Sequence, residues 1–382
     1  MKRSRVLMLM MFVCAVTTAP AFGNPFTPGN LVVVRPGQYG SNGNAVASFL
    51  DEYTPTGVLV QSLALPTTVS GPHRRLTLSG NGGHEGILSR SADGRYLTLG
   101  GYDSPPGAAT TGDRVIGRVD AGGIVDTATA LSNTYVGTGV FSSVATDDGT
   151  RFWLGGSAGN DPSSGIRYAT YGATNSVRLA TNPTSTISTK VFGGQLYASS
   201  SVFPFRGVNS VGSGLPTTGG QTVTNLPGTG GATPPIPTDF YLASPDLLYI
   251  CDARVAASGG GIQRWERTGG TWTLDYTLAL GANRGCYGLT GTYDAGLGTT
   301  RVFATTTDGI FGTLTGNSLV SITDSGPGSA FTLLATAASQ NPPGSAAFLG
   351  VAFAPVPEPS TLSLLLLAAP IAWRRRRSCP GS

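Results

Sequence analysis

The chain has 382 residues, of which 56 are glycine and 26 proline, and only 12% are charged. Its formal net charge of +4 comes from the ends: they hold seven of the 24 basic residues and one of the 20 acidic ones, leaving 17 and 19 in the middle. A middle portion with a charge of about −2 and no basic patch argues against a nucleic-acid partner. The richness in Gly and Pro, with no window of helical period, predicts an all-β domain.

Residues 1–23 have the pattern of an export signal. Lys2, Arg3 and Arg5 form a charged start, and the apolar run at residues 6–16 is too short to span a bilayer comfortably. Small residues follow, so we expect cleavage after Ala21 or Gly23. The folded domain is therefore expected over residues 24–354.

A hairpin pattern recurs along that domain. Its clearest copy is at residues 86–103, where two apolar-alternating runs flank an Asp93-Gly94 turn. Related copies are expected at residues 141–156, 191–199, 240–252 and 288–306, and residues 261–280 read as a further hairpin behind one of them. Second strands are expected to start near Leu31, Tyr96, Phe152, Leu196, Leu248 and Val302, at separations of 65, 56, 44, 52 and 54 residues. Four strands repeated at this spacing are typical of a β-propeller blade.

The two ends of the domain predict how the ring closes. Residues 31–35 read as a second strand with no first strand before them, and residues 348–354 read as a first strand with no second strand after them. If the C-terminal strand completes the N-terminal blade, six blades of four antiparallel strands close without an open edge. Seven blades, a sandwich or a solenoid are the alternatives.

Residues 207–237 are the least regular part of the repeat. Paired glycines and the run GTGGATPPIP disfavour both helix and ladder there. We expect a long exposed loop on the fourth blade.

Few residues suggest chemistry. His84-Glu85 could sit at a channel mouth, but a lone pair lacks the further ligands that a metal needs, so a loop histidine is favoured. Turn chemistry explains the Asp-Gly pairs without calcium. No catalytic residue, cofactor or metal is predicted. The aromatic residues of one hairpin are a candidate carbohydrate surface, with packing between blades as the favoured interpretation: Trp265, Trp272 and Tyr276.

Four cysteines occur, and Cys14 and Cys379 belong to the terminal signals. Cys251 and Cys286 remain in the folded domain. Export to an oxidising compartment would allow a disulfide between them. Two small buried hydrophobic side chains are the favoured interpretation.

Residues 355–382 carry the most specific motif. Pro357, Glu358 and Pro359 precede a short apolar stretch at residues 362–373 and then a basic cluster of Arg374, Arg375, Arg376 and Arg377. This tail resembles the PEP-CTERM sorting signal of Gram-negative bacteria. The resemblance implies transient anchoring in the inner membrane, recognition by an exosortase-type processing enzyme, cleavage, and delivery to the cell surface or extracellular matrix in bacteria that make exopolysaccharide.

The expected function is a non-enzymatic binding or structural role at the cell envelope, linked to exopolysaccharide. The alternative is an extracellular propeller-type hydrolase or lyase acting on polysaccharide or phosphate esters. It would require Asp, Glu, His or Asn side chains that converge at one channel mouth. A scaffold that only adds bulk to the matrix is a third candidate.

Overall fold

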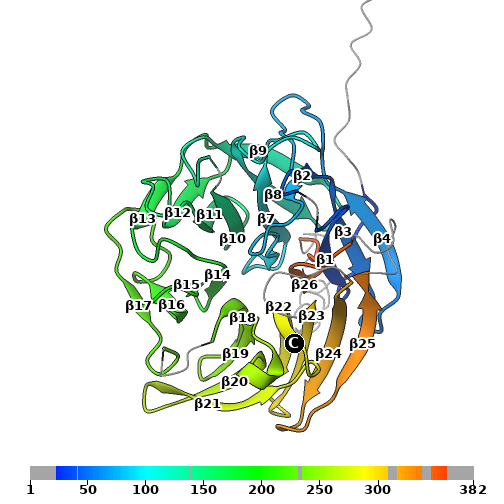
Figure 1. Ribbon diagram of the computed structural model, residues 1–382, viewed down its shortest axis with the longest axis vertical. Helices are drawn as coiled ribbons and strands as arrows, with labels where there is room; N and C mark the ends of the chain where they lie inside the picture. Colours follow the sequence, from blue (N-terminus) through cyan, green and yellow to red (C-terminus); the bar gives the residue numbers. More distant parts are fainter. Residues whose placement is uncertain are drawn as a thin grey trace, which may run out of the picture.

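The computed structural model describes residues 23–40, 42–137, 139–230, 235–308, 316–337 and 346–358. Most of the predicted export signal, Pro359, the apolar stretch and the four arginines therefore lie outside the described residues. Six four-stranded antiparallel sheets surround a central axis (Figure 1), which makes the domain a six-bladed β-propeller as predicted. Within the described ranges, no helix has the length and apolar character needed to cross a membrane.

We number the blades along the ring and give each from its inner to its outer strand. Blade 1 is β26 (Val351–Phe353), β1 (Leu31–Pro36), β3 (Ser48–Tyr53) and β4 (Leu59–Ala64). Blade 2 is β6 (Ser89–Arg90), β7 (Tyr96–Tyr102), β8 (Arg114–Asp120) and β9 (Val125–Leu131). Blade 3 is β10 (Val140–Thr146), β11 (Arg151–Ser157), β12 (Ile166–Thr170) and β13 (Val177–Ala180).

The other half of the ring has the same order. Blade 4 is β14 (Thr189–Phe192), β15 (Gln195–Ser200), β16 (Gly207–Val211) and β17 (Val223–Asn225). Blade 5 is β18 (Pro237–Ser244), β19 (Leu247–Asp252), β20 (Gly261–Thr268) and β21 (Thr271–Leu278). Blade 6 is β22 (Arg284–Asp294), β23 (Thr299–Asp308), β24 (Ser318–Asp324) and β25 (Phe331–Thr336). A small extra sheet pairs β2 (Ala45–Val46) with β5 (Leu78–Ser79), and a short 3₁₀ turn is η1 (Ala256–Ser258).

The six predicted second strands are confirmed, because the marker residues fall in β1, β7, β11, β15, β19 and β23. These strands are buried along most of their length, since both faces are covered by neighbouring blades. The Asp93-Gly94 turn also forms as expected, with Gly94 at a φ of 79°. Only glycine adopts that region without steric cost.

Ring closure by the C-terminal strand is confirmed. β26 pairs antiparallel with β1, with Leu31 opposite Phe353 and Val33 opposite Val351. The ladder is extended where the amide of Val34 donates to the carbonyl of Gly350 (3.0 Å) and the amide of Leu349 donates to the carbonyl of Val34 (2.8 Å). The strand that completes blade 1 thus arrives from the other end of the chain (Figure 1).

The expected long loop at residues 207–237 is wrong in its first half. β16 and β17 lie there and form the third and fourth strands of blade 4. Three buried valines, Val208, Val211 and Val223, supply the apolar contacts of these strands. The glycines around these strands obscure the apolar alternation in the sequence, and the strands are recognisable only once the neighbouring blades cover them.

Hydroxyl groups join one blade to the next near the ring centre. From blade 2 to blade 3, Thr98 Oγ1 donates to the carbonyl of Val144 (2.7 Å). The same kind of contact joins the later blades: Ser143 with Thr189 (3.1 Å), Ser188 with Asp239 (2.7 Å), Thr238 with the carbonyl of Cys286 (3.0 Å), and Thr305 with the carbonyl of Leu349 (2.5 Å). Between blades 1 and 2 the backbones meet directly, because the amide of Gly350 donates to the carbonyl of Gly86 (2.9 Å).

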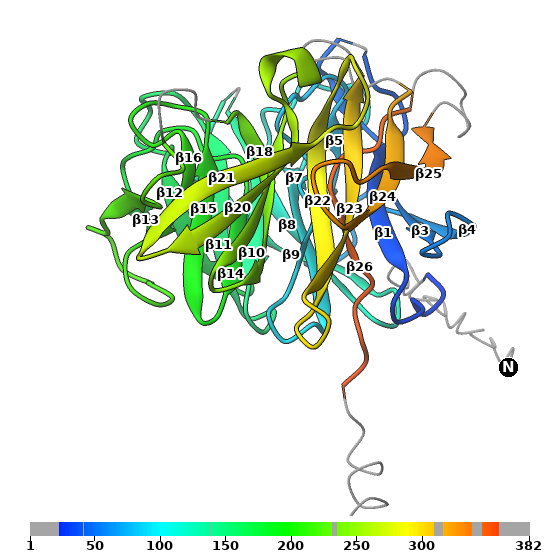
Figure 2. The ribbon, with the colours of Figure 1, turned by 90° about the horizontal axis from the view of Figure 1, so that it is seen from below.

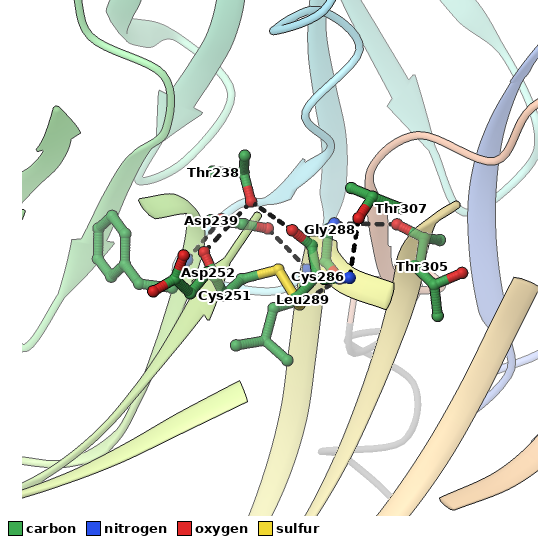
Figure 3. The surroundings of a disulfide bond; sticks show 12 residues. Thr238, Asp239, Cys251, Asp252, Cys286, Gly288, Leu289, Thr305 and Thr307 are labelled. Atoms are coloured by element: carbon green, nitrogen blue, oxygen red, sulfur yellow. Dashed lines mark hydrogen bonds between the residues drawn. A yellow bond between two sulfur atoms is a disulfide. The ribbon is translucent and has the colours of Figure 1, made fainter. Parts of the chain in front are cut away.

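Cys251 and Cys286 form a disulfide, so the favoured interpretation of two separate buried thiols is wrong. The second strand of blade 5 and the inner strand of blade 6 run close enough to bring the two Cα atoms to 5.0 Å. Thr238 lies over the bond and donates to the carbonyls of both cysteines, at 3.2 and 3.0 Å (Figure 3). The disulfide therefore reinforces a contact between blades that the hydroxyl also makes.

We expect the double variant Cys251→Ala/Cys286→Ala to lose about 4 kcal/mol of unfolding free energy, because the bond closes a loop between residues 35 apart. Urea unfolding measures this loss. A reductant should lower the wild-type midpoint and leave that of the double variant in place. A wild-type midpoint insensitive to reductant would contradict the bond.

The closing contact can be tested at Gly350. A Cβ there would overlap the backbone nitrogen of Leu88 and the carbonyl oxygen of Gly86, neither of which can move aside easily. Gly350→Ala should therefore destabilise the protein by about 1–3 kcal/mol in urea unfolding. Gly328→Ala is the matched control, since a Cβ at Gly328 meets nothing within 4 Å. Equal stability of the two variants would refute the close approach at this junction.

Candidate functional site

The buried carboxylate of Glu85 lies beside the ring centre, in the connection between blades 1 and 2. Its Oε1 accepts the hydroxyl of Tyr102 (2.5 Å) and its Oε2 accepts the amide of Ser79 (2.9 Å). The hydroxyl of Tyr287, from the inner strand of blade 6, donates to the carbonyl of Glu85 (2.7 Å). Burial raises the pKa of Glu85, against these side-chain hydrogen bonds and the charge of Arg114, which lower it. This network holds the connection against the inner strands.

A second buried carboxylate, Asp239, joins blades 4, 5 and 6. It accepts the hydroxyl of Ser188 (2.7 Å) and the amide of Leu289 (3.0 Å), and the ammonium of Lys190 lies 3.1 Å from its Oδ1. Figure 3 shows Asp239 on the inner strand of blade 5, next to the disulfide. Both buried carboxylates have several partners within the protein, as the cost of burying a charge requires.

The two histidines lie on the connection between blades 1 and 2. His73 forms an isolated bridge with Ser70, and its Nδ1 accepts the amide of Thr127 (3.4 Å). His84 is half-buried, and burial lowers its pKa. No group of three or more His, Cys, Asp or Glu side chains that could hold a metal occurs among the residues that the structure describes.

The structure separates the three aromatic residues of the candidate carbohydrate surface. Trp265 and Trp272 are 6% and 4% exposed and belong to one apolar cluster between blades 4 and 5. Tyr276 packs against a different cluster, between blades 5 and 6, where its hydroxyl donates to Asp324 (2.7 Å). They do not form one flat surface.

A β-bulge causes this separation. In the pairing of β20 with β21, Trp265 lies opposite Leu274 and Arg264 opposite Tyr276, so Asp275 is an extra residue in β21. One extra residue turns every following side chain to the other face of the sheet. Without it, positions 272 and 276 would share a face, as simple alternation suggests.

A cleft of about 460 Å³ opens between blades 4 and 5, at the edge of the cluster that contains Trp272. Blade 4 contributes Tyr197 and Ser210, which lie opposite each other in the β15–β16 pairing. Blade 5 contributes Trp272 and Arg267, which lie opposite each other in the β20–β21 pairing. Each wall thus pairs an aromatic ring with a polar group.

Gln195 and Phe192 extend the blade 4 wall. The Gln195 amide is fixed, because its Nε2 donates to the carbonyl of Leu196 (2.8 Å) and its Oε1 accepts the amide of Gly214 (2.8 Å). Phe192 and Tyr197 are half-buried, and burial raises the pKa of Tyr197. The guanidinium of Arg267 stands 3.7 Å from the exposed carboxylate of Asp246. The cleft, defined here by Phe192, Gln195, Tyr197, Ser210, Arg267 and Trp272, can offer ring faces and hydrogen-bond donors to one ligand.

A larger groove of about 790 Å³ lies on the other face of the ring. It is bounded by the connections between the second and third strands of blades 1 and 2, including Gln38, Asn44, Phe49 and Gly107. Asn44 Nδ2 donates to the carbonyl of Gly107 (2.8 Å), which joins the two connections. The groove combines small residues with three carboxamide side chains, Gln38, Asn42 and Asn44, and one aromatic ring, Phe49. The aromatic cleft differs in having several aromatic rings and a guanidinium.

The chain ends share a face with the aromatic cleft. The amide of Gly23 donates to the carbonyl of Gly123 (3.2 Å), and the amide of Val356 donates to the carbonyl of Gly94 (2.9 Å). Gly94 lies in the turn between β6 and β7 and Gly123 in the turn between β8 and β9. The residues after β26 run downward toward this face in Figure 2. The cleft is bounded by equivalent turns at Gly193 and Gly270, on blades 4 and 5.

Of the cleft residues, the sequence indicated only Trp272. Tyr197 and Arg267 belong to different blades, and no local spacing relates them. An aromatic residue three positions after the Gly193-Gly194 turn is the single local signal, and ordinary strand alternation explains it equally well.

No family model and no curated protein matches this chain. Similar solved structures include lignostilbene dioxygenase from Pseudomonas brassicacearum, at 8% identity over 88% of this chain and 95% of that one, with a TM-score of 0.43. TolB from Acinetobacter baumannii shares 10% identity over 86% and 68%, with a TM-score of 0.39. A hypothetical selenium-binding protein from Sulfolobus tokodaii shares 10% over 87% and 94%, with a TM-score of 0.40. Likeness this distant does not indicate what the present chain binds or catalyses.

The raised pKa of Glu85 predicts a pH dependence of stability. Its charged form is disfavoured by folding, so its contribution to stability is greatest below the ordinary pKa of 4.5 and falls as pH rises toward the folded value. Glu85→Gln cannot ionise. Its unfolding free energy relative to wild type should therefore increase with pH, by at most about 1.4 kcal/mol per pH unit within that window.

Urea unfolding between pH 4 and pH 8 measures this difference. The introduced amide does not titrate, so a hydrogen bond that it makes poorly shifts the unfolding free energy of the variant by the same amount at every pH. Glu266→Gln, at an exposed glutamate that pairs with Arg264, is the control for the loss of one carboxylate charge. A difference between Glu85→Gln and wild type that stays flat with pH would rule out the raised pKa.

Proposed function

We propose that the chain is an exported propeller, sorted to the cell surface or extracellular matrix, that binds exopolysaccharide without catalysing a reaction on it. The aromatic cleft between blades 4 and 5 is the proposed binding site. Its composition is the observation that carries the proposal, since ring faces there stand next to a guanidinium, an amide and a hydroxyl.

Saccharides suit such a cleft for a physical reason. A pyranose has apolar C–H faces that pack on aromatic rings and a rim of hydroxyls that need hydrogen-bond partners. Tyr197 and Phe192 offer half-buried ring faces, and Arg267 offers several N–H donors at the rim. A volume of about 460 Å³ is within the range of pockets for small ligands, and one or two sugar units of a longer chain would fit.

The proposed export and surface location are inferred from the sequence. The entry of the tail, Pro357 and Glu358, lies at the surface of blade 2, and the rest of the motif is outside the described residues. Its resemblance to the PEP-CTERM signal supports transient anchoring in the inner membrane and processing by an exosortase-type enzyme. The disulfide between Cys251 and Cys286 fits an oxidising compartment.

A binding role is favoured over a hydrolase or lyase by the placement of the carboxylates near the ring centre. Glu85 and Asp239 are buried and engaged by hydrogen bonds from the protein. The aromatic cleft has no carboxylate among the residues that line it. Recognition by packing and hydrogen bonding is the chemistry that this lining supports.

Binding of exopolysaccharide fragments to the purified chain, measured by a glycan array and then by calorimetry, tests the proposal. Tyr197→Ala and Arg267→Ala should each weaken binding about tenfold, because each removes one contact worth about 1–1.5 kcal/mol. Tyr171→Ala, at a tyrosine 44% exposed on blade 3, is the matched control and should bind as wild type does.

Trp265 is unsuitable for this test, since it is buried and its loss would act through stability. Equal binding by wild type and Tyr197→Ala would show that the glycan does not bind in the aromatic cleft. Absence of binding to every glycan tested would favour the matrix scaffold over the binding protein.

A further inference from the structure

The last described residues of the chain lie against blade 2 beside a shallow pocket of about 280 Å³. The propeller wall of the pocket is formed by Arg95 and Tyr96, from the hairpin of the Asp93-Gly94 turn, and by residues 120–122 from the next turn. The tail forms the facing wall with Val356, Pro357 and Glu358. The start of the sorting motif is therefore part of the surface of the folded domain.

Two contacts hold the tail there. The amide of Val356 donates to the carbonyl of Gly94 (2.9 Å), which continues the direction of β26 beyond its last strand residue. The guanidinium of Arg95 forms an ion pair with the carboxylate of Glu358. Glu358 is the acidic residue of the Pro-Glu-Pro motif.

Arg95 is held in position for this contact. Its Nε lies 2.5 Å from Oδ2 of Asp93, whose Oδ1 also accepts the Arg95 amide at 3.0 Å. The guanidinium carbon lies 5.6 Å from the centre of the Tyr96 ring. A fixed guanidinium loses less conformational entropy when it binds a carboxylate than a free one does.

Exposure to solvent increases along the docked segment toward its C-terminal end. Pro355 is buried and Val356 half-buried, whereas Pro357 is exposed and the Glu358 side chain retains 67% of its accessible surface. Release of Glu358 therefore requires only the loss of an exposed ion pair, with no unfolding of the blade. Such pairs are weak, so the docked and released states can exchange easily.

We propose that the Asp93–Arg95 turn of blade 2 is a docking site for the chain's own sorting motif, and that Arg95 competes with the processing enzyme for Glu358. This inference rests on the proposed sorting of the chain. An enzyme that recognises the Glu358 carboxylate can bind only the released tail. The apparent affinity of the enzyme for the chain is therefore its intrinsic affinity multiplied by the fraction of molecules whose tail is released. The folded domain thereby limits how fast its tail is processed.

Arg95→Ala tests the proposal by two independent readouts. The first is hydrogen exchange of the peptide that spans residues 354–358 in the purified full-length chain, which reports docking without any enzyme. The second is the rate of tail cleavage in cells that carry the processing enzyme. Both rates should rise roughly two- to fivefold, as expected for loss of one exposed ion pair.

Arg151→Ala is the matched control. Arg151 follows the equivalent turn of blade 3 and pairs with Asp147, but it does not line the pocket beside the tail. A second variant, Val356→Pro, removes the N–H that donates to Gly94 and leaves Arg95 intact. It should also speed cleavage, whereas Arg151→Ala should behave as wild type in both readouts.

The outcomes separate this inference from the proposed function. If exchange and cleavage are the same in Arg95→Ala as in Arg151→Ala, the docking site is refuted and sorting stands. Slower cleavage in Arg95→Ala would also refute it, since Arg95 would then help the enzyme. If exchange rises but the wild-type tail is never cleaved, docking stands and the sorting proposal fails.

Discussion

The ring depends on hydrogen bonds that join each blade to the next near its centre. With only 12% charged residues, the chain has few ion pairs to use, and Ser and Thr hydroxyls make most of these contacts instead. In three of them, Thr98, Thr238 and Thr305 each donate to a backbone carbonyl of the next blade. Where blades 1 and 2 meet, Gly350 and Gly86 bring the two backbones into direct contact.

Two buried carboxylates extend the same arrangement. Asp239 contacts Ser188 and Lys190 from blade 4 and Leu289 from blade 6. The carboxylate of Glu85 accepts the hydroxyl of Tyr102, and its carbonyl accepts the hydroxyl of Tyr287 from blade 6. The disulfide adds a covalent contact between blades 5 and 6 at the same depth (Figure 3). The ring centre therefore acts as a rigid support, and open clefts lie between the blades and at their edges.

The features assigned to function lie together on one face of the ring. The aromatic cleft and the docked tail both border hairpin turns of this face, on different blades. Turns suit both roles, because they are exposed and their side chains are free of the ladder. Arg95 at the tail and Arg267 at the cleft each stand next to a turn and next to an aromatic ring. A rigid scaffold keeps these separate sites at fixed positions.

Local patterns were enough to predict the six second strands, the Asp93-Gly94 turn and the closing strand, because alternation and turn chemistry depend on neighbours in the chain. Pairing of Leu31 with Phe353 could be predicted because each end lacked one strand of a repeat. Three features depended on which faces of separate blades meet in the folded ring. They are the Cys251–Cys286 bond, the strands within residues 207–225 and the aromatic cleft. The bulge at Asp275 shows why such features cannot be predicted from local sequence. One extra residue places Tyr276 and Trp272 on opposite faces of the same sheet.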